Sequence, residues 1–140
     1  MTKNKLLLML VITIAATACQ VGSATDESER MYQLASPLTK LSAAVESTCF
    51  YKNPPPSAAD QTLLSLATAH DATLLEPFAD FKLRAECKQQ HGFVLVCSKD
   101  GDRALLEDAG CSGKLDGHLW KDHKKSCEFT LTVQTSCDVP

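Results

Sequence analysis

Six of the seven cysteines lie between residues 49 and 137, and they set the strongest limit on how this chain can fold. An even number of cysteines in a short exported chain indicates a framework of disulfide bonds. The six residues are Cys49, Cys87, Cys97, Cys111, Cys127 and Cys137. We therefore expect a small domain stapled by up to three disulfides.

The first 18 residues have the three parts of a secretory signal. Lys3 and Lys5 form a basic start, residues 6–15 are an apolar run, and small residues precede Cys19. A transmembrane helix needs about 20 apolar residues, so this run is too short to span a bilayer. We interpret residues 1–18 as a cleavable signal peptide and exclude them from the fold.

The residues before Cys19, Ala16-Thr17-Ala18, together with Cys19 itself resemble a bacterial lipobox. This resemblance to small bacterial lipoproteins implies cleavage before Cys19 and lipidation of that cysteine, including palmitate. It also implies a periplasm-facing protein in the cell envelope, and Gln20 fits delivery to the outer membrane. Ordinary signal peptidase sites at Ala16–Ala18 and at Gly22-Ser23-Ala24 remain the alternative.

The chain from Cys19 onward has 12 basic and 17 acidic residues, a net charge of −5. This charge argues against general nucleic-acid binding, which requires a basic surface. Residues 19–30 are small, polar and acidic, and we interpret them as the lipidated cysteine and its tether, with the start of a helix as a compatible reading. Residues 31–140 are predicted to form a single domain.

Two helices are predicted before the first strand. Ser36 and Pro37 are typical of a helix start, and the apolar residues after them recur every three or four positions. This stripe comprises Leu38, Leu41, Val45 and Cys49, and Met31 and Leu34 continue its period upstream, where a helical turn kinked at Pro37 would fit.

A second helix is predicted to begin with a variant capping box at Ser57–Asp60 and to end at Pro77. Its apolar stripe comprises Ala59, Leu63, Leu66, Ala67, His70 and Leu74. Pro54-Pro55-Pro56 lies between the helices. We interpret the three prolines as a stiff connector within a helical hairpin rather than as a polyproline ligand for a partner.

After residue 80 the apolar period changes from 3.6 to 2, which predicts strands. The four predicted strands cover residues 81–87, 93–97, 103–107 and 127–137, with turns at 90–92 and at Asp100-Gly101. Helices followed by an antiparallel meander indicate an α+β fold. We expect an N-terminal helical hairpin packed on a four-stranded antiparallel sheet.

The predicted strands restrict the disulfide pairing. Cys127 and Cys137 would lie about 33 Å apart in a continuous strand, too far to pair. The expected bonds are Cys87–Cys97, Cys111–Cys127 and Cys49–Cys137. Cys49–Cys87 is the main alternative.

The sequence carries no strong catalytic or metal-binding motif. His118 and His123, with Asp116 and Asp122, could hold zinc or copper, but a solvated loop is the preferred interpretation. Asp100-Gly101-Asp102 resembles part of a calcium loop and is better explained as a hairpin turn. His70 beside Asp71 could be a general base, although a histidine on an apolar stripe is more often structural. We predict no enzyme activity, no metal and no cofactor.

The most distinctive segment, residues 112–126, lies between two cysteines and carries a local net charge of +2 and the only tryptophan. Aromatic and basic residues on a constrained loop are typical of binding hot spots. The predicted partner-binding residues are Asp116, His118, Leu119, Trp120 and Lys121. The alternative, slightly preferred, is that Leu119 and Trp120 fold back over the edge of the sheet.

These features together predict a non-enzymatic lipoprotein that binds another protein. The class that fits best is an inhibitor or immunity protein against a cell-wall hydrolase or a secreted toxin, since an acidic surface suits capture of a basic hydrolase. A structural or assembly lipoprotein of the envelope is the first alternative. A carrier of metal or a small ligand is the second.

Overall fold

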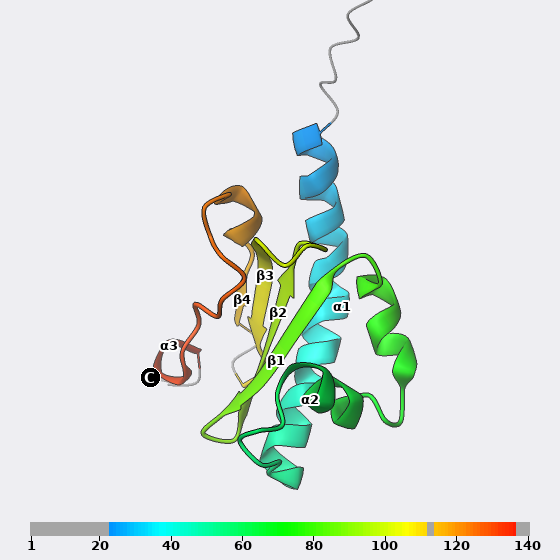
Figure 1. Cartoon of the computed structure of the whole chain (residues 1–140), viewed down its shortest axis with the longest axis vertical. Helices are drawn as coiled ribbons and strands as arrows, with labels where there is room; N and C mark the ends of the chain where they lie inside the picture. Colours follow the sequence, from blue (N-terminus) through cyan, green and yellow to red (C-terminus); the bar gives the residue numbers. More distant parts are fainter. Residues whose placement is uncertain (1–22, 112–113, 137–140) are drawn as a thin grey trace, which may run out of the picture.

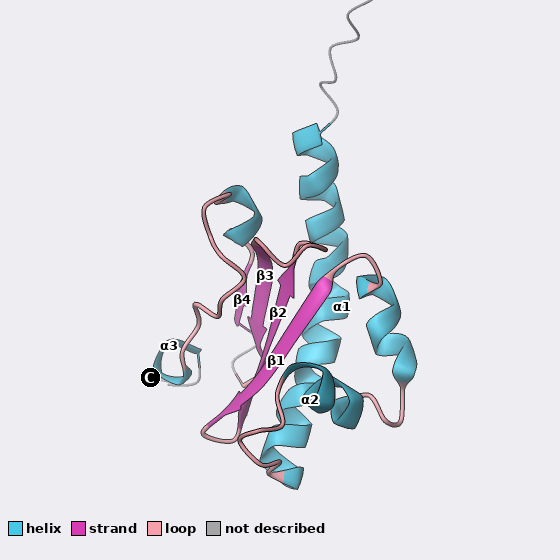
Figure 2. Cartoon of the chain, viewed as in Figure 1, coloured by secondary structure: helices cyan, strands magenta, loops and turns pink. Residues whose placement is uncertain are grey.

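The computed structural model describes residues 23–111 and 114–136. A long helix, α1 (Ser23–Lys52), lies against one face of a four-stranded antiparallel sheet (Figures 1 and 2). The strands are β1 (Lys82–Lys88), β2 (His91–Cys97), β3 (Ala104–Ala109) and β4 (Lys114–Asp116), in the order β1-β2-β3-β4. The predicted α+β class is confirmed.

Helix α1 begins 13 residues earlier than Ser36, the expected start, and passes through Pro37 without ending. Proline removes one backbone hydrogen bond and usually breaks a helix. Here the apolar stripe on both sides of Pro37 is buried and holds the helix on the core: Met31, Leu34, Leu38, Leu41, Val45 and Cys49 are each at most 7% exposed. The segment expected as a tether is therefore helical from Ser23.

The second predicted helix is interrupted. Helix α2 (Asp60–Ala67) ends after two turns, and the 3-10 helix η1 (Ala72–Phe78) follows. Thr68 Oγ1 donates to Leu64 O at 2.9 Å, while Asp71 accepts from Thr73 N at 3.1 Å. These side-chain bonds compete with continuation of the helix.

The predicted stripe of the second helix is therefore correct at Leu63, which is buried beside Leu64, and at Ala67 and Leu74, which are partly buried against the same core. It is wrong at Leu66 and His70. Leu66 is 39% exposed and His70 lies in an exposed turn. The predicted capping box does not form either, because Ala59 is the residue that precedes the helix and has no capping side-chain bond.

The first three strands lie where the sequence predicts them, to within three residues. Strand β2 is buried on both faces: Val94 and Val96 pack with α1, whereas Leu95 and Cys97 face Leu119 on the other side. This two-sided burial explains its continuous apolar sequence. Gly101, with φ of 82°, forms the predicted turn between β2 and β3.

The fourth predicted strand is wrong over residues 127–136, and its last residue, Cys137, lies outside the described residues. The fourth position in the sheet belongs to β4, and residues 129–132 form an extended segment that belongs to no strand and precedes α3 (Val133–Ser136). This segment crosses the second face of the sheet, where Leu131 is 7% exposed. The alternating pattern in the sequence thus reflects one buried side of an extended chain, which needs no strand partner.

A buried carboxylate holds this segment in place. Glu107 in β3 is fully buried and accepts hydrogen bonds from Thr130 N at 2.9 Å, Thr130 Oγ1 at 2.7 Å and Leu131 N at 2.9 Å. Hydrogen bonds to a charged acceptor are stronger than neutral ones. Glu107 therefore stabilises the cover over the second face of the sheet.

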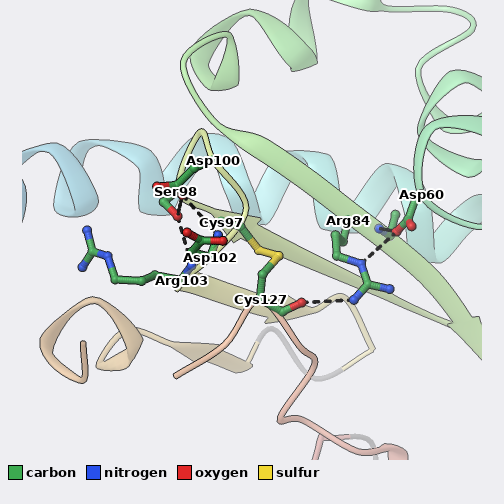
Figure 3. Close-up of a disulfide and its surroundings, with 9 residues drawn as sticks. Asp60, Arg84, Cys97, Ser98, Asp100, Asp102, Arg103 and Cys127 are labelled. Atoms are coloured by element: carbon green, nitrogen blue, oxygen red, sulfur yellow. Dashed lines mark hydrogen bonds and ion pairs between the residues drawn. A yellow bond between two sulfur atoms is a disulfide. The ribbon is translucent and has the colours of Figure 1, made fainter. Parts of the chain in front are cut away.

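Two disulfides join elements that are distant in sequence. Cys49–Cys87 links α1 to β1, and Cys97–Cys127 links β2 to the C-terminal segment (Figure 3). All three expected pairs are therefore corrected, and the alternative Cys49–Cys87 is confirmed. Cys111 is also disulfide-bonded, to a partner outside the described residues.

The incorrect pairing has a geometric cause. Cys87 and Cys97 would lie at equal height on neighbouring strands only if the turn were centred on residue 92. The turn actually lies at Gln89-Gln90, so that Cys87 is opposite Gly92 and Cys97 is opposite Lys82. The two cysteines consequently lie at opposite ends of the β1–β2 ladder.

Two glycines allow α1 to approach the sheet closely. A Cβ atom at Gly92 would lie 2.5 Å from Glu46 N, and one at Gly110 would lie 2.6 Å from Glu46 Cβ. Gly110 N also donates to Gly92 O at 3.2 Å. The helix backbone thus rests directly on this part of the sheet.

We predict that Gly92→Ala lowers the free energy of unfolding by about 1–3 kcal/mol or more, because the new methyl group meets helix backbone that cannot rotate away. Urea unfolding with the disulfides intact measures the effect. Gly117→Ala is the matched control, since its Cβ would meet the Trp120 ring at an ordinary 3.4 Å. Equal effects of the two substitutions would contradict the close contact.

Candidate protein-binding site

The predicted binding segment is described except for residues 112 and 113. Leu119 and Trp120 begin the 3-10 helix η2 (Leu119–Lys121) and are 4% and 5% exposed. This burial agrees with the alternative in which they fold back over the sheet. Asp116 in β4 is half-buried and accepts from His118 N at 3.2 Å.

Polar and aromatic side chains surround the buried Trp120. The His118 ring stacks on it with 6.4 Å between centroids, and Lys121 Nζ lies 5.5 Å from the ring centroid. Tyr32 of α1 contacts the same indole edge-on at 5.5 Å and is 66% exposed. The segment therefore offers a partner His118, Lys121 and the neighbouring Tyr32, with Trp120 as their support.

The two histidines of this segment have different neighbours: His118 stacks on Trp120, whereas His123 contacts Arg103. His123 Nδ1 lies 2.8 Å from Arg103 Nη1, and the guanidinium can only donate, so this nitrogen accepts. Among the described residues, the group with metal-ligand spacing is instead Glu46, His91 and Cys111. Because Cys111 is disulfide-bonded, its sulfur is not available as a thiolate ligand.

Glu46 and His91 join α1 to β2. Glu46 Oε1 lies 2.9 Å from His91 Nδ1, and Glu46 Oε2 accepts from Gly92 N. This contact lies where the two glycines bring the helix onto the sheet. We assign the pair a structural role.

The remaining sequence candidates for chemistry are local structural features. Asp71 accepts from both Thr73 N and Thr73 Oγ1, so it caps η1, and His70 is exposed beside it. In the β2–β3 turn, hydrogen bonds from Ser98 Oγ and Asp102 N hold the pKa of the Asp100 carboxyl below its ordinary value (Figure 3).

Arg84 bridges two parts of the chain next to the Cys97–Cys127 disulfide (Figure 3). Its Nη1 donates to Cys127 O at 3.1 Å, and its Nε lies 3.4 Å from Asp60 Oδ1. Asp60 also accepts from Ala85 N at 3.1 Å. The start of α2, strand β1 and the C-terminal segment are thereby connected.

The most exposed aromatic pair was not predicted from the sequence. Phe50 and Tyr51 are 54% and 80% exposed and contact each other edge-on at 5.0 Å. They directly follow Cys49, the last residue of the buried stripe, and precede the prolines. Two adjacent aromatic residues off the apolar face of a helix were the available sequence signal. We call Phe50 and Tyr51 the aromatic tip.

Asp108 is a buried carboxyl, and neither of its oxygens has a hydrogen-bond partner of normal geometry among the described residues. Burial raises its pKa, and Thr39 and the Ala109 amide offset part of that rise. The Thr39 hydroxyl donates to Ala35 O at 3.2 Å. Because the folded-state pKa is raised, ionisation of Asp108 opposes folding as the pH rises from the unfolded value through the folded one.

We predict that Asp108→Asn raises the free energy of unfolding at pH 7 by of order 1 kcal/mol, because a neutral side chain avoids the buried charge. The gain should disappear below pH 3.8, the ordinary pKa, where wild-type Asp108 is protonated in both states. Urea unfolding as a function of pH measures this. Asp102→Asn, in the surface turn, is the control, and a gain independent of pH would contradict the prediction.

Comparisons with protein-family models, curated proteins and solved structures found no match for this chain. Within the described residues, no helix is both long and apolar enough to cross a membrane. The residues and their geometry are therefore the basis for inferring a function.

Proposed function

We propose that this protein is a lipid-anchored envelope protein that binds another protein through the aromatic tip. The exposure of Phe50 and Tyr51 is the observation that carries the proposal. Aromatic residues are enriched among the side chains that dominate binding energy at interfaces. An exposed, touching pair contributes nothing to the buried core and offers a partner a large apolar contact.

The aromatic tip is held on a rigid support. Cys49, the residue before Phe50, is bonded to Cys87 of β1, which fixes the end of α1 to the sheet. Asn53 then adopts a left-handed conformation with φ of 41°, as expected just after a helix, and Pro54–Pro56 follow. Such preorganisation lowers the conformational entropy lost on binding.

The position of the aromatic tip suits a protein anchored at its N-terminus. A helix of 30 residues extends about 45 Å, and the tip lies at the end of α1 opposite Ser23 (Figure 1). Lipidation at Cys19, four residues before the helix, would leave the tip directed away from the membrane. We propose that it reaches partners in the periplasm.

The partner class that we favour is a basic protein, such as a cell-wall hydrolase or a secreted toxin, which this protein would inhibit or neutralise. The net charge of −5 from Cys19 onward would attract a basic protein and accelerate association. The assignment to inhibitors or immunity proteins is an analogy of class, based on size, export and disulfides.

We predict that replacing both Phe50 and Tyr51 with Ala weakens partner binding at least about tenfold and leaves the melting temperature nearly unchanged. The disulfide-bonded chain, residues 20–140, would capture partners from envelope and secreted extracts for identification by mass spectrometry. The affinity of each variant for the purified partner is then measured by calorimetry.

Tyr32→Ala is the matched control, because Tyr32 is also an exposed tyrosine on α1 and lies about 28 Å from Tyr51 along the helix. If Tyr32→Ala weakens binding and the tip variant does not, the partner contacts His118 and Lys121 instead. Recovery of resident envelope-assembly proteins alone would favour the structural role over inhibition.

Anchoring gives a separate prediction. Cys19→Ser should abolish lipid modification and move the protein from the membrane fraction to the soluble fraction, because the thiol is the site of acylation. Mass spectrometry of the purified protein and cell fractionation measure the two effects. Wild-type protein with an unmodified N-terminus after residue 18 or 24 would refute the lipoprotein assignment.

A further inference from the structure

A neutral groove opens near the end of α1. It has a volume of about 410 Å³, within the usual range for small-ligand sites. The proline loop, the β1–β2 turn and the Cys49–Cys87 disulfide meet there. Its lining residues are Cys49, Asn53, Pro54, Pro55, Pro56, Cys87, Gln89 and Gln90.

The β1–β2 turn in this groove has an unusual sequence for its conformation. Lys88 pairs with His91, which leaves Gln89 and Gln90 as a two-residue turn with φ of 50° and 68°. Two left-handed residues are characteristic of a type I′ turn, where Asn-Gly is strongly preferred. Glutamine in this region is uncommon, and strained backbone is a reason to look for function.

The glutamine side chains make no described contact that explains this choice. Both residues are exposed, and neither side-chain amide hydrogen-bonds to a described residue. Asn53 adds a third carboxamide to the lining of the groove. Each carboxamide can both donate and accept hydrogen bonds.

The lining indicates an uncharged ligand. None of the eight groove residues carries a charge, and the three prolines add apolar ring surface. A second hollow, about 710 Å³, shares Gln89 and continues past Lys88 to Thr132 and Gln134. The Lys88 ammonium lies 2.5 Å from Glu86 Oε1, so its charge is already paired. The two hollows therefore adjoin at Gln89, next to each other at the β1–β2 turn.

We infer that this groove binds a neutral glycan chain, and the inference does not depend on the protein partner proposed above. Sugar hydroxyls donate and accept hydrogen bonds, as carboxamides do, and the apolar faces of sugar rings can pack on the proline rings. A peptide that added a strand at the β1 edge is less suited, because Asp60 already accepts from Ala85 N at that edge.

The decisive variant converts the turn Gln89-Gln90 to Asn-Gly. It removes the carboxamide at position 90, draws the one at position 89 back by one methylene and supplies the residues that a type I′ turn prefers. We expect the melting temperature to rise by roughly 2–8 °C and glycan affinity to fall at least about tenfold. A purely structural turn would give the first change without the second.

Binding is measured by calorimetry with the full disulfide-bonded chain and four probes: N-acetylglucosamine hexamer, maltohexaose, an anionic heparin hexasaccharide and a neutral hexapeptide. Saturable binding of at least one neutral hexasaccharide at millimolar concentration or below, lost in the turn variant, is the expected result. Asn53→Gly should also weaken binding, since glycine accepts φ of 41° without strain.

Gln61→Ala, an exposed glutamine on α2, is the off-site control and should bind as wild type does. No binding of either neutral hexasaccharide, binding of the heparin or peptide probe alone, or unchanged affinity in the turn variant would overturn the inference. Capture of the protein partner by the turn variant should stay at wild-type levels, so failure of this inference and failure of the proposed function are distinguishable.

Discussion

The close approach of α1 to the sheet at Glu46 is the contact on which the rest of the structure depends. Gly92 and Gly110 leave room for the helix backbone, and Glu46 binds His91 and Gly92 N at that point. The Cys49–Cys87 disulfide lies one helical turn further along. Steric fit, hydrogen bonding and a covalent bond therefore fix the same end of α1, and this end carries the aromatic tip and the neutral groove.

The two buried carboxylates of β3 show how differently the two faces of the sheet are built. Glu107 points to the face opposite α1 and binds the extended C-terminal segment through three hydrogen bonds. Asp108 points to the α1 side and gains no comparable partners among the described residues. Glu107 holds the extended segment that covers its face of the sheet, whereas Asp108 opposes folding when it is ionised.

Local patterns in the sequence predicted the elements better than their partners. The buried stripe of α1 and the apolar run of β2 follow directly from side-chain period, because burial imposes that period. The disulfide pairing failed because it depends on the turn position: Cys87 faces Cys97 only if the turn is centred on residue 92, whereas the turn lies at Gln89-Gln90. The fourth strand was predicted wrongly for another reason: an extended segment bound by Glu107 alternates between buried and exposed side chains just as a strand does.

The candidate sites were harder to predict because exposure is a property of the assembled fold. Trp120 attracted attention by its rarity and is buried, while Phe50 and Tyr51 lie on the outward side of α1. Exposed aromatic rings and left-handed glutamines both lower stability, and the core requires neither. They occur at the best-fixed end of the molecule, where a rigid scaffold can support unfavourable local features. We place recognition at this end rather than at Trp120, because destabilising local features persist there on a rigid support.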